Sequence, residues 1–179
     1  MKKTFVQKLC LCALLAAFCF VLDYAATLLN SVSGVLKLPL GGLPIIVAAI
    51  MCGPLMGAAV GLIGTFLTQL ITYGLTPTTA LWILPAGVRG LCAGLLFIAF
   101  GKSLKIPVLT VETVISSLVV TALNTIVIYL DSVIYGYYSK AVVFGGLAFR
   151  IISGVIASVV FALLLPAVLR VIEKHKKTA

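Results

Sequence analysis

The sequence predicts an all-α membrane protein, a bundle of six transmembrane helices with both termini in the cytoplasm. Of its 179 residues, 63% are apolar and only 9% are charged, whereas soluble proteins carry about 25% charged residues. Residues 38–88 contain no charge at all. At about 20 residues per span, six spans use most of the chain, so we expect a single integral membrane domain over residues 1–179 with short loops.

Apolar segments, separated by turn-prone residues, define the six spans. The first ends in the polar stretch 30–34, and the short second stops at Gly53-Pro54, because proline begins a helix far more readily than it continues one. The fourth follows a Gly-Leu-Thr-Pro turn, with Thr78 or Thr79 as N-cap. The fifth follows the polar loop 102–107, and the sixth runs into the basic tail. We place the spans at residues 5–29, 42–52, 54–73, 79–100, 108–135 and 141–172.

Lysine and arginine set the orientation. They gather near both termini and in the loop before the fifth span, as Lys2, Lys3, Lys8, Lys102, Lys105, Arg170, Lys174, Lys176 and Lys177. The positive-inside rule puts all three regions in the cytoplasm, which requires an even number of spans and leaves Lys37 and Lys140 outside. The alternative is five spans with segment 42–52 re-entrant, but this would place the basic tail outside. The same rule explains the net charge of +9 without nucleic acid.

Four charged residues fall within or near the apolar segments: Asp23, Arg89, Asp131 and Arg150. Each costs at least a few kcal/mol if it faces lipid. The two arginines lie roughly 15 Å and 13 Å along their helices, so both should point into the bundle. Two interpretations stay open. Either the aspartates and arginines form internal salt bridges, or at least one arginine meets an anionic ligand that enters from outside.

Other polar and aromatic groups are candidates for the same site. They are Asn124, Tyr129, Tyr135 and Tyr137 on the fifth segment, and Tyr73, Thr76, Thr78, Thr79 and Trp82 around the third loop. A flat, polar ligand could stack on Trp82 or Tyr73 above an arginine. An aromatic belt at the membrane interface explains the aromatic residues equally well.

Signatures of enzymes and metal sites were sought and are missing. The sequence has no HExxH, Walker A or nucleophile-elbow motif, and its five cysteines show no metal-ligand spacing. We therefore expect no enzyme, no metal and no cofactor, and active uptake would need a partner with a nucleotide site. No helix shows a repeated polar stripe that could line a pore, which disfavours a channel. Small residues four apart predict close helix contacts, at Ala13/Ala17, Gly57/Gly61 and Gly90/Gly94.

Three stretches carry a family resemblance. Residues 11–18, LCALLAAF, look like the AxxxA helix of substrate-binding S components of energy-coupling factor (ECF) vitamin transporters. Residues 36–61, with Gly53-Pro54 and Gly57, are similar to the stretch that follows in the folate-type branch, and Arg89-Gly90 with Gly94 matches a further feature. The third helix departs from the folate-type pattern, because Gly61-Leu-Ile-Gly-Thr65 stands where many members carry an acidic residue.

The resemblance implies a compact bundle in the bacterial plasma membrane, with a pocket near the outer face under the first, third and fifth outer loops. Such a subunit binds a vitamin, with a folate-like compound expected first and pantothenate or riboflavin next. It docks through Ala13 and Ala17 on a transmembrane coupling protein that two cytoplasmic ATPases drive, and it topples to release its cargo.

For the ligand carboxylate we expect Arg89 first and Arg150 second. The rest of the expected site is Trp82, Tyr73, Asn124 and Asp131. The alternative from another class is a non-transporting membrane scaffold, such as an MreD-like cell-shape protein. A scaffold would bind protein partners through the same small-residue faces and would need no outer pocket.

Overall fold

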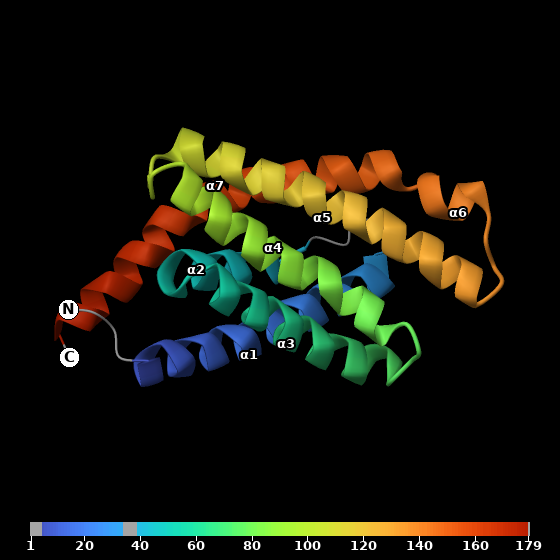
Figure 1. Ribbon diagram of the computed structural model, residues 1–179, viewed down its shortest axis with the longest axis horizontal. Coiled ribbons are helices and arrows are strands. Elements are labelled where there is room, and N and C mark those ends of the chain that lie inside the picture. Colours follow the sequence, from blue (N-terminus) through green and yellow to red (C-terminus); the bar gives the residue numbers. More distant parts are fainter. Residues whose placement is uncertain (1–4, 34–38, 179) are drawn as a thin grey trace.

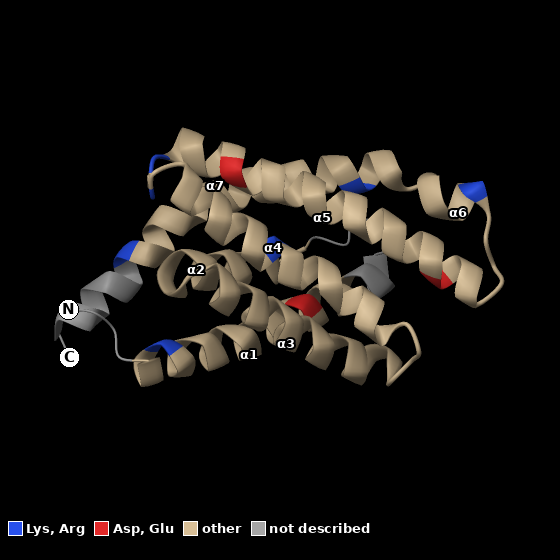
Figure 2. Cartoon of the chain, in the orientation of Figure 1, with Lys and Arg blue, Asp and Glu red and all other residues tan. Residues whose placement is uncertain are grey.

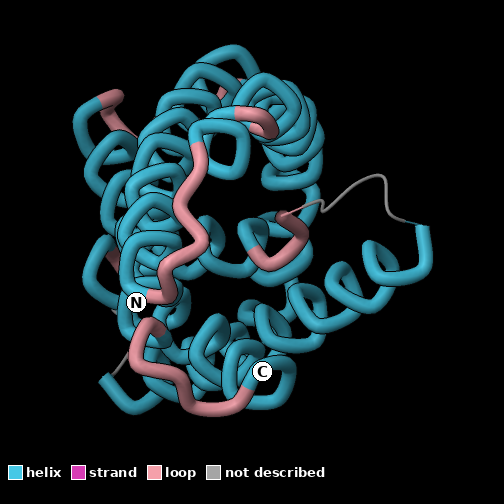
Figure 3. Tube along the Cα trace, turned by 90° about the vertical axis from the view of Figure 1, so that its right-hand side faces the viewer, coloured by secondary structure: helices cyan, strands magenta, loops and turns pink. Residues whose placement is uncertain are grey.

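The computed structural model describes residues 5–33 and 39–178, with side chains for residues 5–29 and 39–170, and every regular element in this part is a helix (Figures 1 and 3). The helices are α1 (Phe5–Ser33), α2 (Gly42–Cys52), α3 (Pro54–Tyr73), α4 (Thr79–Ala99), α5 (Ile106–Ile134), α6 (Lys140–Phe144) and α7 (Leu147–Thr178). The all-α prediction is confirmed. The expected outer position of Lys37 falls outside the described residues.

Five of the predicted segments are long and apolar enough to cross a membrane, and α2 is the exception. Its 11 residues extend about 16 Å at 1.5 Å per residue, roughly half of a 30 Å hydrocarbon core. The bounds of α2 and α3 agree with the predicted segments 42–52 and 54–73. The second helix therefore exists where the sequence places it, but it spans only half the thickness of the bundle.

The sixth predicted segment, 141–172, is not one continuous helix. Gly145 and Gly146 separate the five-residue α6 from α7. Two successive glycines each disfavour a helix by about 1 kcal/mol relative to alanine, which explains the interruption. As a result, Arg150 lies in the first turn of α7, and not deep within a long helix.

The basic regions share one end of the bundle. The start of α1, the α4–α5 loop and the later part of α7 lie at the left in Figure 1, and Figure 2 shows Lys and Arg of these segments there. The opposite end holds the α3–α4 and α5–α6 loops. This arrangement agrees with the charge pattern, and the assignment of the basic end to the cytoplasm stays a prediction.

Helices α3 and α4 approach through glycine. A methyl group at Gly94 would lie 2.6 Å from Cα of Pro54, and one at Gly90 would overlap the backbone of Gly57. A methyl group at Gly61 would overlap the carbonyl of Ala86. The expected close packing of these glycines is confirmed, and it holds α4, with Arg89, against the rest of the bundle.

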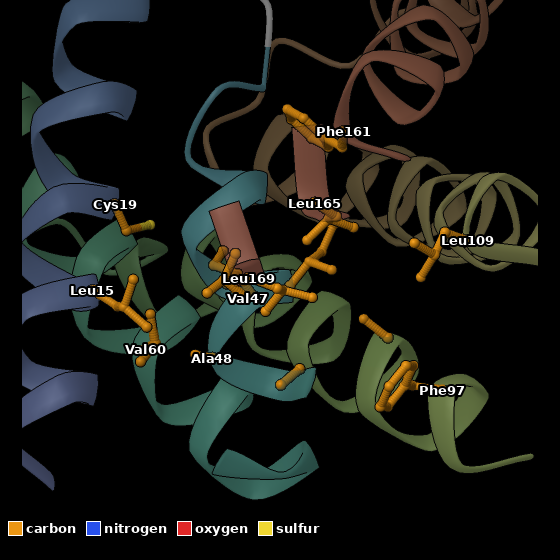
Figure 4. Packing of buried hydrophobic residues seen from close by; sticks show 14 of the residues in the cluster. Leu15, Cys19, Val47, Ala48, Val60, Phe97, Leu109, Phe161, Leu165 and Leu169 are labelled. Atoms are coloured by element: carbon orange, nitrogen blue, oxygen red, sulfur yellow. The ribbon is translucent and has the colours of Figure 1, made fainter. Parts of the chain in front are cut away.

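Helix α2 lies in the centre of the core. Figure 4 shows Val47 and Ala48 of α2 among Leu15 of α1 and the leucines Leu165 and Leu169 of α7. Its N-terminal end, at Gly42, lies beside the Arg89 side chain of α4. Because Arg89 is about 15 Å from the start of α4, α2 begins near mid-depth and fills only the basic half of the bundle.

Candidate ligand-binding site

A small cavity opens between α2, α4, α5 and α7 at this mid-depth level. Its lining residues are Pro39, Ile46, Arg89, Thr113, Ser116, Ser117, Gly154, Ala157, Ser158 and Phe161. The volume is about 10 Å³, roughly what one water molecule needs. One charged side chain and four hydroxyl groups thus meet around a small space inside an apolar bundle.

Arg89 brings a positive charge to the cavity. Its guanidinium packs so closely on Gly42 that a methyl group there would overlap Nη1. The charge of Asp23 on α1 acts on the Arg89 guanidinium. An arginine within a membrane bundle normally pairs with an acidic group or a carbonyl. Arg89 thus brings a guanidinium with several N–H donors to the cavity wall, near one acidic residue.

Hydroxyl groups of α5 and α7 form the wall that faces Arg89. The hydroxyls of Thr113 and Ser158 each donate to the other residue's carbonyl, both at 3.1 Å. The hydroxyl of Ser116 donates to the carbonyl of Arg89 at 3.4 Å. A methyl group at Gly154 would lie 2.6 Å from Oγ of Ser117. Glycine at this position therefore lets α7 come close to α5 beside the cavity.

Asp23 acts on Arg89 through its charge, and its carboxylate also holds the backbone where α2 begins. Its Oδ1 accepts a hydrogen bond from the backbone N–H of Gly41 at 3.0 Å, and Oδ2 lies 3.9 Å from the Cys19 thiol. The thiol also reaches the Gly41 carbonyl at 3.5 Å. Non-helical backbone at membrane depth must have its polar groups satisfied within the protein. Asp23 and Cys19 do this for Gly41, where the chain enters α2.

Asp131 joins the two loops at the opposite end. Its carboxylate accepts hydrogen bonds from Trp82 Nε1 at 3.1 Å, from the Tyr137 hydroxyl and from the Thr78 hydroxyl. The bond to Asp131, together with burial, raises the pKa of Tyr137 to about 12. Thr78 does occupy the N-cap position of α4, but its side chain caps no backbone N–H. Its hydroxyl serves Asp131 instead.

Arg150 binds backbone carbonyls at the α6–α7 junction. Its Nη2 donates to Val143 at 2.6 Å and its Nε to Gly146 at 3.3 Å, whereas Nη1 is buried without a partner. Arg150 thus binds carbonyls, whereas the charge of an acidic residue, Asp23, acts on Arg89. Arg150 fixes the turn between the two helices.

The other expected site residues do not line the cavity. Tyr73 is 60% exposed at the end of α3, Asn124 is half-buried on α5, and Tyr129 packs edge-on against Tyr138. Trp82 and Asp131 belong to the loop cluster, and Ala13 and Ala17 are exposed on α1. Of the residues expected to bind ligand, the structure brings only Arg89 to the cavity.

Sequence reasoning missed the hydroxyl wall. Thr113, Ser117 and Thr121 lie four residues apart on α5, and Ser116 joins their face. This is a polar stripe, but its members are buried, so it does not contradict the prediction that no polar stripe lines a pore. The stripe faces α7 and a cavity of water size, and Thr121 donates to the carbonyl of Ser117 at 2.9 Å. Spacing of Ser and Thr was the signal that could have identified it.

Glu112 was also missed. It lies on the same helix, is 1% exposed, and neither carboxyl oxygen has a hydrogen-bond partner. No cluster of potential metal ligands occurs in residues 5–33 and 39–178.

Together, the membrane-spanning bundle and its charged internal cavity define a membrane-embedded binding protein. The chain matches the family described as ECF transporter, substrate-specific component, over residues 7–165, and it belongs to that family. It is a multi-pass cell-membrane protein and the substrate-binding subunit of a transporter, not an enzyme or an MreD-like scaffold. Membership implies a substrate and an ECF module as partners. Neither the curated proteins nor the solved structures that were compared include a match.

Proposed function

We propose that this S component binds a vitamin or vitamin precursor with a carboxylate group, and that Arg89 receives this carboxylate. A folate-like compound ranks first, followed by pantothenate, and then by riboflavin-like compounds. The single observation that carries the proposal is that the Arg89 side chain lines the cavity together with four hydroxyl side chains. An arginine presents several N–H donors to a carboxylate in matching geometry.

The hydroxyl groups suit the rest of a polar ligand. Thr113, Ser116, Ser117 and Ser158 can each donate or accept a hydrogen bond, whereas Phe161, Ile46 and Pro39 supply apolar contact. Small-molecule sites typically combine such an apolar lining with a few placed polar groups.

The small volume of the cavity requires a change of structure on binding. A volume of about 10 Å³ is far below the several hundred Å³ of a typical ligand site, roughly 300 Å³ or more. The loops joined at Asp131 lie at the end of the bundle opposite the basic residues, so we propose that their separation opens the path to Arg89. Arg150 and the loop cluster of Trp82 and Asp131 then act at this entrance and not as first contacts of the carboxylate. Tyr73 and Asn124 remain candidate ligand contacts.

For uptake, we propose docking through α1 on a transmembrane coupling protein driven by two cytoplasmic ATPases. Ala13 and Ala17 are exposed on α1, one turn apart. Small residues let another helix approach closely in lipid without a buried charge. Bulky substitution of both, Ala13→Leu with Ala17→Leu, should abolish co-purification with the coupling protein while leaving ligand binding unchanged.

Calorimetric titration of the purified protein against folates, pantothenate, riboflavin, thiamine, biotin and pyridoxal tests the substrate. We expect one tight binder with a carboxylate. In the variant Arg89→Ala its affinity should fall about 10- to 100-fold, the range of a charge-assisted hydrogen bond. Arg170→Ala, at an exposed position of α7, is the matched control. Equal loss of folding and binding in Arg89→Ala would show that Arg89 is structural and overturn its assigned role.

A further inference from the structure

Two residues of α1 hold the backbone of Gly41 from both sides. Asp23 accepts the Gly41 N–H at 3.0 Å, and the Cys19 thiol reaches the Gly41 carbonyl at 3.5 Å. These residues lie four apart, on one face of the helix. There is also no room for a side chain at this position, since a methyl group at Gly41 would overlap the Asp23 carboxylate. Helix α1 therefore fixes the position of Gly41 closely.

The next residue, Gly42, touches the cavity side chains. A methyl group there would overlap Arg89 Nη1 and would lie 2.9 Å from Cε2 of Phe161. Arg89 and Phe161 both line the cavity. Because Gly41 and Gly42 are adjacent in the chain, a shift of Gly41 away from Asp23 moves Gly42 relative to Arg89.

We propose that Asp23 is a positioning residue of the cavity: by holding Gly41 it keeps Gly42 packed on Arg89 and so fixes the guanidinium where the ligand meets it. Asp23 does not line the cavity, and its charge acts on Arg89 from behind Gly41. The inference deepens the proposed function and rests on it for the identity of the site.

Helix α1 has two faces with different roles, one for a partner and one for the start of α2. Ala13 and Ala17 are exposed on one, and Cys19, which is fully buried, marks the other. A partner that displaces α1 from its exposed face would pull on Gly41 through Asp23 and Cys19. The start of α2 then moves relative to Arg89, which weakens the hold on the ligand at the stage when cargo must leave.

Chemical modification of arginine by phenylglyoxal tests this without any vitamin. The protein in lipid nanodiscs is treated with the reagent, and modification of Arg89 and of Arg170 is followed by mass spectrometry. In Asp23→Ala we expect Arg89 to react about fivefold faster, the effect of one lost hydrogen bond, with Arg170 unchanged. In Asp23→Asn, which keeps the acceptor oxygen and removes the charge, Arg89 should react more slowly than in Asp23→Ala, because the hold on Gly41 is kept.

A second variant disturbs the same contact from the other side. Gly41→Ala keeps Asp23 but places a methyl group against its carboxylate, so Arg89 should again react faster. This result stands even if Asp23→Ala fails to fold. Unchanged reactivity of Arg89 in both Asp23→Ala and Gly41→Ala would overturn the proposal, and so would equal acceleration in the alanine and asparagine variants of Asp23.

The outcome is separable from that of the proposed function. If the modification rates follow the expected order but no vitamin binds, the positioning role stands and the substrate assignment fails. If a vitamin binds through Arg89 but the rates do not respond, the function stands and the role of Asp23 fails.

Discussion

Thr113 and Ser158 hold α5 and α7 together by a reciprocal pair of hydrogen bonds, each hydroxyl donating to the other's carbonyl at 3.1 Å. Both residues are buried, and both hydroxyls also donate within their own helices, Ser158 to Gly154 at 2.7 Å and Thr113 to Leu109 at 2.8 Å. In a bilayer, where apolar burial gives little preference for protein over lipid, such bonds help to specify which helices pair.

Removing this pair should loosen α5 from α7. Hydrogen bonds between membrane helices contribute about 0.6 kcal/mol each on average, so Thr113→Val with Ser158→Ala should lower the free energy of unfolding by about 1 kcal/mol. Thermal unfolding in detergent measures the loss. Thr110→Val is the control, because Thr110 donates only within its own helix, to Ile106 at 2.9 Å. An equal effect of the control would show that the pair contributes nothing specific.

Alanine substitution of glycines in the bundle should have one of two effects, a loss of stability or a loss of ligand affinity. At Gly90 an added methyl group meets the backbone of Gly57, which cannot move without displacing α3, so Gly90→Ala should destabilise the protein by about 1–3 kcal/mol. At Gly42 the first atom met is the end of the Arg89 side chain, which can turn away. Gly42→Ala should therefore fold nearly normally and bind ligand at least about tenfold more weakly, since the charge-assisted contact is misplaced.

Unfolding temperature and calorimetric affinity, measured on the same two variants, check this separation. If Gly42→Ala retained full affinity, Arg89 would not be the carboxylate contact. A Gly90→Ala protein as stable as wild type would mean that α3 and α4 tolerate a wider spacing than the structure shows.

The helices could be predicted from the sequence because hydrophobicity and proline or glycine punctuation act locally. Gly53-Pro54 ends α2 and begins α3 at the predicted positions. The site could not be predicted to the same degree, because it depends on which helix faces which. Arg89 could be identified from its depth in the membrane alone. The hydroxyls of Ser117 and Ser158 become part of a site only because α5 packs against α7.

The partners of the charged residues were even harder to predict from the sequence. Asp23 and Asp131 were equally good salt-bridge partners for the arginines by sequence. In the structure Asp23 binds a backbone N–H and Asp131 binds an indole and two hydroxyls. Those contacts are made with loops whose path no periodicity specifies. Hydropathy also failed to predict the break in the sixth segment at Gly145 and Gly146, because the low helix propensity of two successive glycines does not change the apolar character of the segment.

Loss of the Asp131 carboxylate should release the α3–α4 loop from the α5–α6 loop. Trp82 is the only tryptophan and donates to Asp131, so its fluorescence reports directly on this contact. Asp131→Ala should shift the emission to longer wavelength and raise quenching by acrylamide, and a bound vitamin should dissociate faster. Tyr137→Phe removes one donor and should give a smaller change in the same direction.

Tyr129→Phe is the control, since Tyr129 contacts Tyr138 and not Asp131.

The pH dependence of this contact follows from Tyr137, whose pKa rises from 10.0 to about 12 through its bond to Asp131. A raised pKa means that this contribution is complete below pH 10 and is lost as the pH rises through about 12. Trp82 emission should thus stay constant around neutral pH and change only at strongly alkaline pH. A change near neutral pH would show that another group controls the contact.

The buried carboxyl group of Glu112 should destabilise the folded protein. It is 1% exposed, and neither of its carboxyl oxygens has a hydrogen-bond partner, whereas a buried polar group left unsatisfied costs about 1–3 kcal/mol. Replacement by an apolar side chain of similar length removes that cost, so Glu112→Met should raise the free energy of unfolding by about 1–3 kcal/mol. Thermal unfolding at constant lipid composition measures it, with Val111→Met, on the exposed face of α5, as the control for adding methionine. Glu112→Gln keeps the polar burial and should gain little. A less stable Glu112→Met protein would show that the carboxyl group has a partner in the folded protein. The first candidates would then be the residues of α4 near Ala93, because Ala93 lies one turn from Arg89, whose carbonyl Ser116 contacts.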